Sequence, residues 1–267
     1  MTVLPAVEPI HALFILLGGL WAGTINSVVG SGTLVTFPVL IGLGYAPVKA
    51  TISNAMGLVA GGAAGVWGYR QELVGMRTNL VLLLPASLLG GITGAFLLLH
   101  LPESVFGVAA PFLIVLALAM VLLQPRLQRY VKRRAEANDG VPHRSHTAIM
   151  IALVYFAGVY GGYFVAAQGI LLVGILGIFM TGTLQNANAV KNVLSLAVNL
   201  IAAVSYLMSA ADKIIWPVVG LIAVSSLIGG FIGSRIGRRL SPLVLRLVIV
   251  TLGTVALYFM VGKLLTS

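Results

Sequence analysis

The residues of this chain that could do chemistry are amides, hydroxyls and one lysine inside or beside long apolar runs. Polar groups at membrane depth are costly and usually face a cavity or another helix. Lys191 opens the run from Val190 to Leu207, and it either reaches the membrane surface or binds an anion. The polar residues of this kind are Thr24, Asn26, Ser27, Ser31, Thr33, Ser53, Asn54, Gln168, Asn186, Asn188, Lys191, Asn192 and Asn199. They form a binding site or hydrogen-bond across helices.

Other chemistries lack the residues they need. The chain has no cysteine, no H-E-x-x-H motif and no pair of aspartates within an apolar run. No Gly-Lys-Ser/Thr follows Gly30-Ser31-Gly32, which excludes a nucleotide-binding P-loop. We therefore expect no enzyme activity, no cofactor and no metal site. All six acidic residues lie in or beside expected loops, which argues against a carboxylate that couples transport to a cation.

The elements that must position these residues are transmembrane helices. Only 8% of the 267 residues are charged, 59% are hydrophobic, and the mean hydropathy is +1.07, which together indicate an integral membrane protein. Apolar runs long enough to cross a bilayer lie at 10–29, 48–69, 77–99, 104–124, 147–166, 186–208, 214–234 and 241–262. Two shorter runs, 33–44 and 170–181, cannot cross alone, so we expect re-entrant or broken helices there. No basic segment precedes the first run, so we expect it to remain as a helix.

The two halves of the chain resemble each other. An offset of 139 residues places Gly19, Gly23 and Gly30 on Gly158, Gly162 and Gly169, and an offset of 138 places Asn54 on Asn192. The sequence thus predicts an all-α polytopic membrane protein with two repeats of five segments each. The repeats are residues 1–123 and 147–267, joined by a basic loop at 124–146. Because five is odd, counting every segment as a crossing makes the two repeats enter the membrane from opposite sides, so we expect them to be inverted.

The placement of positive charge predicts the topology. The chain has a net charge of +10, and placing the loop 124–146 in the cytoplasm puts 12 of the 16 basic residues on that side. Three others, Lys49, Lys213 and Lys263, then lie outside together with both termini. The positive net charge is therefore explained by basic cytoplasmic loops of a membrane protein, and no nucleic-acid partner is expected.

Glycines mark two further features. Pairs such as Gly90/Gly94 and Gly229/Gly233 are spaced by four residues, so each pair lies on one helix face and predicts close helix packing. The Gly30-Ser31-Gly32 sequence breaks the first helix just before a short one begins near Thr33. The free amides and positive dipole end of such a helix start attract anions, although a simple capped turn is the alternative.

The stretch from Gly18 to Thr33, followed by Phe37-Pro38 and by Lys49 to Asn54, resembles the sulfite exporter TauE/SafE family. The resemblance extends along nearly the whole chain and implies an inner-membrane transporter that exports sulfur-containing anions such as sulfite or sulfonates. The second half departs from the motif, because Gln168 stands where the first half has Val29. The substrate-binding residues implied are Asn26, Ser27, Ser31, Thr33, Asn54, Gln168, Asn188, Lys191 and Asn192.

We expect a multi-pass membrane protein that moves a small anionic substrate by alternating access between inverted repeats. Its partners would be that substrate and the lipid bilayer, and the sequence allows a homo-oligomer. A passive anion channel with the same fold is one alternative. The other is a non-transporting membrane scaffold for a sulfur-metabolising partner.

Overall fold

The computed structural model describes residues 7–137, 144–236 and 242–266, and every regular element within them is helical. The first half contains α1 (Pro9–Val28), α2 (Thr33–Gly42), α3 (Pro47–Gly68), the short 3-10 helix η1 (Arg70–Leu73), α4 (Arg77–His100) and α5 (Glu103–Ala137). The second contains α6 (Arg144–Tyr163), α7 (Gln168–Phe179), α8 (Leu184–Ser209), the 3-10 helix η2 (Ala211–Lys213), α9 (Trp216–Ile236) and α10 (Pro242–Thr266).

The predicted helical segments match the observed helices one for one, including the two short helices. α2 and α7 have 10 and 12 residues, whereas each of the others has at least 20. Within the described residues, five helices are both long and apolar enough to cross a membrane: α1, α4, the first part of α5, α8 and α9. The chain is therefore an all-helical, multi-pass membrane protein.

The stretch 124–146 differs from the predicted loop, because α5 continues through Pro125 to Ala137. Arg, Gln, Leu and Ala, which are common after Pro125, are strong helix formers and extend the helix beyond its apolar part. Within this extension the Arg129 side chain donates a hydrogen bond to the carbonyl oxygen of Pro125. Residues 138–143 lie outside the described part of the chain, as do 237–241 and both extreme ends, on which part of the charge prediction rests.

The most extensive helix contacts do not stay within one half of the sequence. α1 and α3 pack on α9, while α6 and α8 pack on α4. We call these two groups the α1–α3–α9 bundle and the α4–α6–α8 bundle, and they meet where α3 packs on α8. In the repeat, α1 corresponds to α6, α3 to α8 and α4 to α9. Replacing each helix of one bundle by its counterpart therefore gives the other bundle. The packing therefore follows the repeat seen in the sequence, with one long helix exchanged between the halves.

The predicted glycine contacts are confirmed. A Cβ on Gly23 would lie 2.1 Å from the carbonyl oxygen of Ser226, and one on Gly229 would lie 2.1 Å from that of Leu20, so α1 and α9 touch through their backbones. Gly90 of α4 faces Tyr155 and Gly158 of α6 in the same way. Small residues permit this approach inside a membrane, where burial of apolar surface no longer drives helix association.

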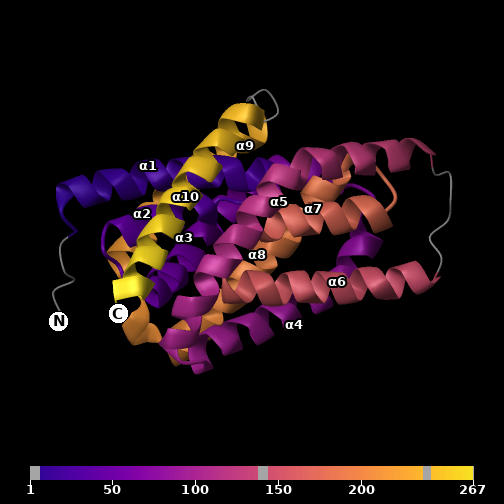
Figure 1. Cartoon of the computed structure of the whole chain (residues 1–267). Helices are drawn as coiled ribbons and strands as arrows, with labels where there is room; N and C mark the ends of the chain where they lie inside the picture. The colour runs from indigo at the N-terminus through magenta and orange to yellow at the C-terminus, as the bar shows by residue number, and fades with distance from the viewer. Residues whose placement is uncertain (1–6, 138–143, 237–241, 267) are drawn as a thin grey trace.

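The described ends of the chain lie on the same side of the molecule in the view of Figure 1. In Figure 1 the start of α1 and the end of α10 are on the left, while the end of α5 and the start of α6 are on the right. α1 and its counterpart α6 also run in opposite directions across this view. The two halves thus begin from opposite ends of the molecule.

Candidate functional site

The two helix breaks expected from the sequence lie directly against each other. The backbone N–H of Gly169, at the start of α7, donates a hydrogen bond of 3.0 Å to the carbonyl oxygen of Gly30, between α1 and α2. A Cβ on Gly30 would lie 2.4 Å from the Cα of Gly169, and one on Gly169 would lie equally close to the Cα of Gly30. Repeat-equivalent glycines therefore form the contact, and neither position has room for a side chain.

The backbone is strained on the α7 side of this contact. Val165 and Ala167 have φ angles of 67° and 57°, in the left-handed region that side-chain-bearing residues rarely adopt. Gly30 has a φ of 83° on the other side, where glycine adopts it without cost. Strained backbone of this kind clusters at ligand-binding and switching segments.

Lys191 is buried within the protein beside the glycine contact. Its side chain is 1% exposed, and its Cδ atom lies 2.9 Å from the Cβ position of Gly169. The ammonium donates to the carbonyl oxygens of Asn26 at 3.0 Å and Ser27 at 3.3 Å. These carbonyls belong to the last turn of α1 and have no partner within that helix. Lys191 therefore caps the negative end of the α1 dipole.

Asn192 strengthens the same contact between bundles. Its amide donates a 3.3 Å hydrogen bond to the carbonyl oxygen of Ser27, which thus accepts from both neighbouring residues of α8. The Ser27 hydroxyl itself donates to the carbonyl oxygen of Thr24 within α1. Asn26 and Ser27 consequently contribute backbone oxygens here, where the sequence suggested side chains. Asn26 is half-buried, and its side chain borders the close approach of Gly32.

Asn54 holds the start of α2 on the opposite side of the break. Its amide nitrogen donates to the hydroxyl of Thr33 at 3.0 Å, and its oxygen accepts from the hydroxyl of Thr36. All three side chains are buried. Asn54 and Asn192 occupy equivalent positions in the repeat but have different roles. Asn54 bonds within its own half of the chain, whereas Asn192 bonds to the other half.

Three predicted residues carry buried polar atoms without a hydrogen-bond partner among the described residues. These atoms are Ser31 Oγ, Gln168 Nε2 and Asn188 Oδ1. Ser31 and Gln168 flank Gly30 and Gly169 in the sequence, and Asn188 lies one helical turn before Lys191. Buried polar groups are nearly always paired, so an unpaired set indicates a binding partner such as water or an ion.

Sequence reasoning missed two contributors. Thr36 completes the bonding of Asn54, and Gly161 of α6 leaves the space in which the Gln168 amide sits, since a Cβ there would lie 2.2 Å from Gln168. The spacing of Thr33 and Thr36 on one helix face could have indicated the first. Asn186, by contrast, forms the α8 capping box with Thr183 and bonds to the carbonyl oxygen of Glu72, so it has a structural role.

No acidic side chain shares this site within the described part of the chain. Glu8, Glu103 and Asp212 are exposed, and Glu72 is half-buried in η1. The side chains of Glu136 and Asp139 lie outside the described residues. Among the described side chains Lys191 is the one charged group in the buried set.

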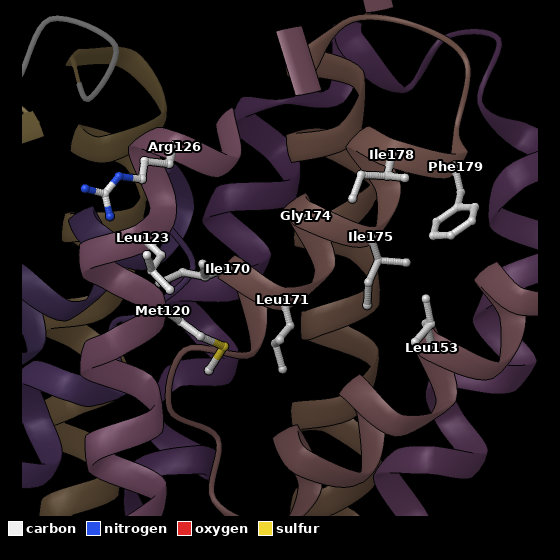
Figure 2. Close-up of a pocket in the computed structure, with 10 residues that line it drawn as sticks. All are labelled: Met120, Leu123, Arg126, Leu153, Ile170, Leu171, Gly174, Ile175, Ile178 and Phe179. Carbon is white, nitrogen blue, oxygen red and sulfur yellow. The ribbon is translucent and has the colours of Figure 1, made fainter. Parts of the chain in front are cut away.

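A pocket of about 500 Å³ lies elsewhere, between α5, α6 and α7. Figure 2 shows a lining of Leu, Ile, Met and Phe side chains, with the Arg126 guanidinium directed away from α7. Such a lining suits hydrocarbon and offers an anion little to bind, so we do not place the substrate there.

Membrane-crossing helices folded around interrupted helices and a buried polar cluster define a membrane transport protein. A comparison with family models agrees with this class. The model described as sulfite exporter TauE/SafE matches residues 15–260, and the chain belongs to this family.

Curated relatives carry transporter names. The chain is 26% identical to the probable membrane transporter protein YfcA of Escherichia coli K12, over 88% of this chain and 85% of that one. It is 24% identical to a probable membrane transporter protein of Haemophilus influenzae, over 81% of each chain. Probable membrane transporter protein ORF9 of Sinorhizobium sp is 26% identical, over 83% of this chain and 81% of the relative. No solved structure matches the chain.

Proposed function

We propose that this membrane transporter exports small sulfur-containing anions, such as sulfite or sulfonates, across the inner membrane. The observation that carries the proposal is the buried ammonium of Lys191 beside the contact between the two helix breaks. An ammonium has three donors, and two are engaged by carbonyl oxygens. A bound oxyanion would take the third donor and supply the missing negative charge.

Neighbouring groups support an anion over a cation. α2 and α7 both begin at the break, so the partial positive charge of each helix start lies there. The Ser31 hydroxyl and the Gln168 amide nitrogen are unpaired groups able to donate a hydrogen bond. An oxyanion accepts hydrogen bonds only, which these donors match.

The packing suggests what moves. Lys191 and Asn192 belong to the α4–α6–α8 bundle, whereas the carbonyls they bind belong to α1 in the α1–α3–α9 bundle. We propose that the bundles rock against each other as inverted units, and that these bonds break and reform as the site opens to alternate sides. The opposite directions of α1 and α6 support this inversion. The moving units would then be the exchanged bundles and not the sequence halves.

Electrostatics favour movement outward. With both termini outside and the interior about 100 mV negative, each charge leaving the cell gains roughly 2.3 kcal/mol. Export thus needs no carboxylate that carries a coupling ion, in agreement with the exposed or half-buried acids of the described chain.

The test is anion flux in proteoliposomes of the purified protein. We expect efflux of sulfite or a sulfonate such as taurine and slower efflux of sulfate, with Asn54→Ala and Asn192→Ala both reducing the rate. Thr254→Val is the matched control, because that hydroxyl bonds within α10 on the exposed surface. Absence of flux for every sulfur anion would overturn the substrate.

The same vesicles separate the rival functions. A carrier exchanges labelled internal anion against external anion, while a passive channel shows no such counterflow and a far higher turnover. A non-transporting scaffold predicts no flux in the vesicles. It also predicts that Asn54→Ala still supports the sulfur-metabolising partner, and that replacing Arg126, Arg129 and Arg133 abolishes this support. The direct Gly30–Gly169 contact favours the carrier, because it closes the break in this conformation.

A further inference from the structure

One face of α8 continues the polar character of the site far beyond Lys191. Asn188, Ser195 and Asn199 are spaced by seven and four residues, so they share that face. The distance from the first to the last is about 17 Å along a helix, more than half of a roughly 30 Å hydrocarbon core. We call these three residues the α8 polar stripe.

Every member of the stripe has an oxygen without a partner among the described residues. These atoms are Asn188 Oδ1, Ser195 Oγ and Asn199 Oδ1. Asn188 and Asn199 are only 7% and 3% exposed, so lipid or bulk solvent does not account for them. Side chains of this kind inside a membrane are expected where water or a hydrated solute passes.

The repeat shows that packing alone does not require polar residues here. The offset of 138 that equates Asn54 with Asn192 also equates Gly57 with Ser195 and Gly61 with Asn199. In α3 these two glycines contact Ile222 and Ser226 of α9 closely, as small residues in a helix interface do. Where the first half has packing glycines, the second half therefore has polar side chains whose oxygens have no partner among the described residues.

The stripe ends at an apolar barrier. Ala202 and Tyr206 continue the same face and are fully buried in a core that includes Phe37 and Phe164. The Tyr206 hydroxyl donates to the carbonyl oxygen of Gly162 at 2.8 Å, and the rings of Phe37 and Phe164 pack edge to face. A route along the stripe would thus be closed at this end in the conformation described.

We propose that the α8 polar stripe lines the route along which the anion moves between the helix breaks and the Ala202–Tyr206 barrier, and that Ser195 and Asn199 contact it. The proposal rests on the transport function proposed above and adds two residues to the path. Small hydrated anions are the class that such a stripe would conduct, because the unpaired Asn188 and Asn199 oxygens accept hydrogen bonds from accompanying water, while the Ser195 hydroxyl and the amide N–H groups can donate to the anion.

Cysteine accessibility tests the stripe without measuring transport, because the natural chain has no cysteine. Asn188→Cys, Ser195→Cys and Asn199→Cys are reconstituted in liposomes and treated on both sides with a negatively charged methanethiosulfonate. Leu200→Cys is the matched control, since Leu200 follows Asn199 directly, lies about 100° around the helix from it and is 46% exposed. Leu194→Cys controls for a fully buried apolar position.

The three stripe variants should react at least about tenfold faster than both controls, because a thiol reacts only where water ionises it and the reagent reaches it. Equal rates at all five positions, or reaction of the Leu200 variant alone, would overturn the proposal. Reactive stripe variants in a protein that moves no sulfur anion would support the route along α8 and overturn the proposed substrate. Sulfur-anion flux with unreactive stripe variants would support the substrate and overturn the route.

Discussion

Lys191 holds a positive charge away from water with only neutral partners around it among the described residues. A cation at the end of a helix gains about 0.3–1 kcal/mol, or up to about 2 kcal/mol when partly buried. Burying an ion costs several kcal/mol, so capping α1 does not repay the burial. We therefore expect Lys191 to act in the anion-bound state, in which the anion forms an ion pair with the ammonium.

Replacing Lys191 separates a binding role from a structural one. Lys191→Met keeps the length and removes the charge, so we expect anion binding to fall by about 10- to 100-fold, as for loss of a charge-assisted hydrogen bond of about 1.5–3 kcal/mol. The unfolding free energy should change by about 1 kcal/mol or less, because the lost cap and the relieved burial oppose each other. Flux titrations and thermal unfolding in detergent measure the two effects. Strong destabilisation with an unchanged affinity would identify Lys191 as structural.

The role of the Lys191 side chain could be predicted only in part. Its type and place at the start of an apolar run identified it as unusual, but sequence allowed both a surface-reaching and a buried conformation. What decided between them is the last turn of α1, whose free carbonyls are about 165 residues away in the chain. Every residue type has the same backbone carbonyl, so the sequence could not show that Asn26 and Ser27 contribute their carbonyl oxygens and not their side chains.

At the scale of elements, the glycine faces fix how closely helices approach. Gly23→Ala would place a Cβ 2.1 Å from the Ser226 carbonyl oxygen, which is backbone and cannot rotate away. We expect it to destabilise the protein by about 1–3 kcal/mol, the usual cost of overpacking. Thermal unfolding monitored by size-exclusion chromatography measures the loss.

Gly220→Ala in α9 is the matched control. Nothing lies within 4 Å of its Cβ position, so the alanine should be neutral or should stabilise the helix by about 0.5–1 kcal/mol. Equal unfolding temperatures for the two variants would show that α1 and α9 do not touch through Gly23.

The elements themselves were predictable because three simple signals agree. The length of each apolar run separates the two short helices from the long ones, glycine breaks mark where α1 and α6 end, and spaced glycines mark contact faces. The end of α5 was not predictable from polarity, because arginine, glutamine and alanine form helix in water as well as in lipid. Nor did any local signal state that α9 packs on α1 and not within its own half.

At the scale of the whole molecule, charge and helix order together make a claim about topology. Val74 follows η1 and is 79% exposed, whereas Met208 lies in the last turn of α8 and is 81% exposed. The long helices α4, α5, α6 and α8 and the short α7 separate them, and counting α7 as a crossing, as the inverted-repeat prediction does, places the two residues on opposite sides. Basic residues gather on the Val74 side, which predicts that this side is cytoplasmic.

Single cysteines read this arrangement directly in cells. A membrane-impermeant thiol reagent added outside should label Met208→Cys in the intact inner membrane, and should label Val74→Cys only after permeabilisation. The reverse pattern would mean that the protein faces the other way and that its basic segments lie outside. Labelling of both from one side would require an even number of traverses, so α6 and its counterpart α1 could not enter the membrane from opposite faces, and rocking of inverted bundles would fail with them.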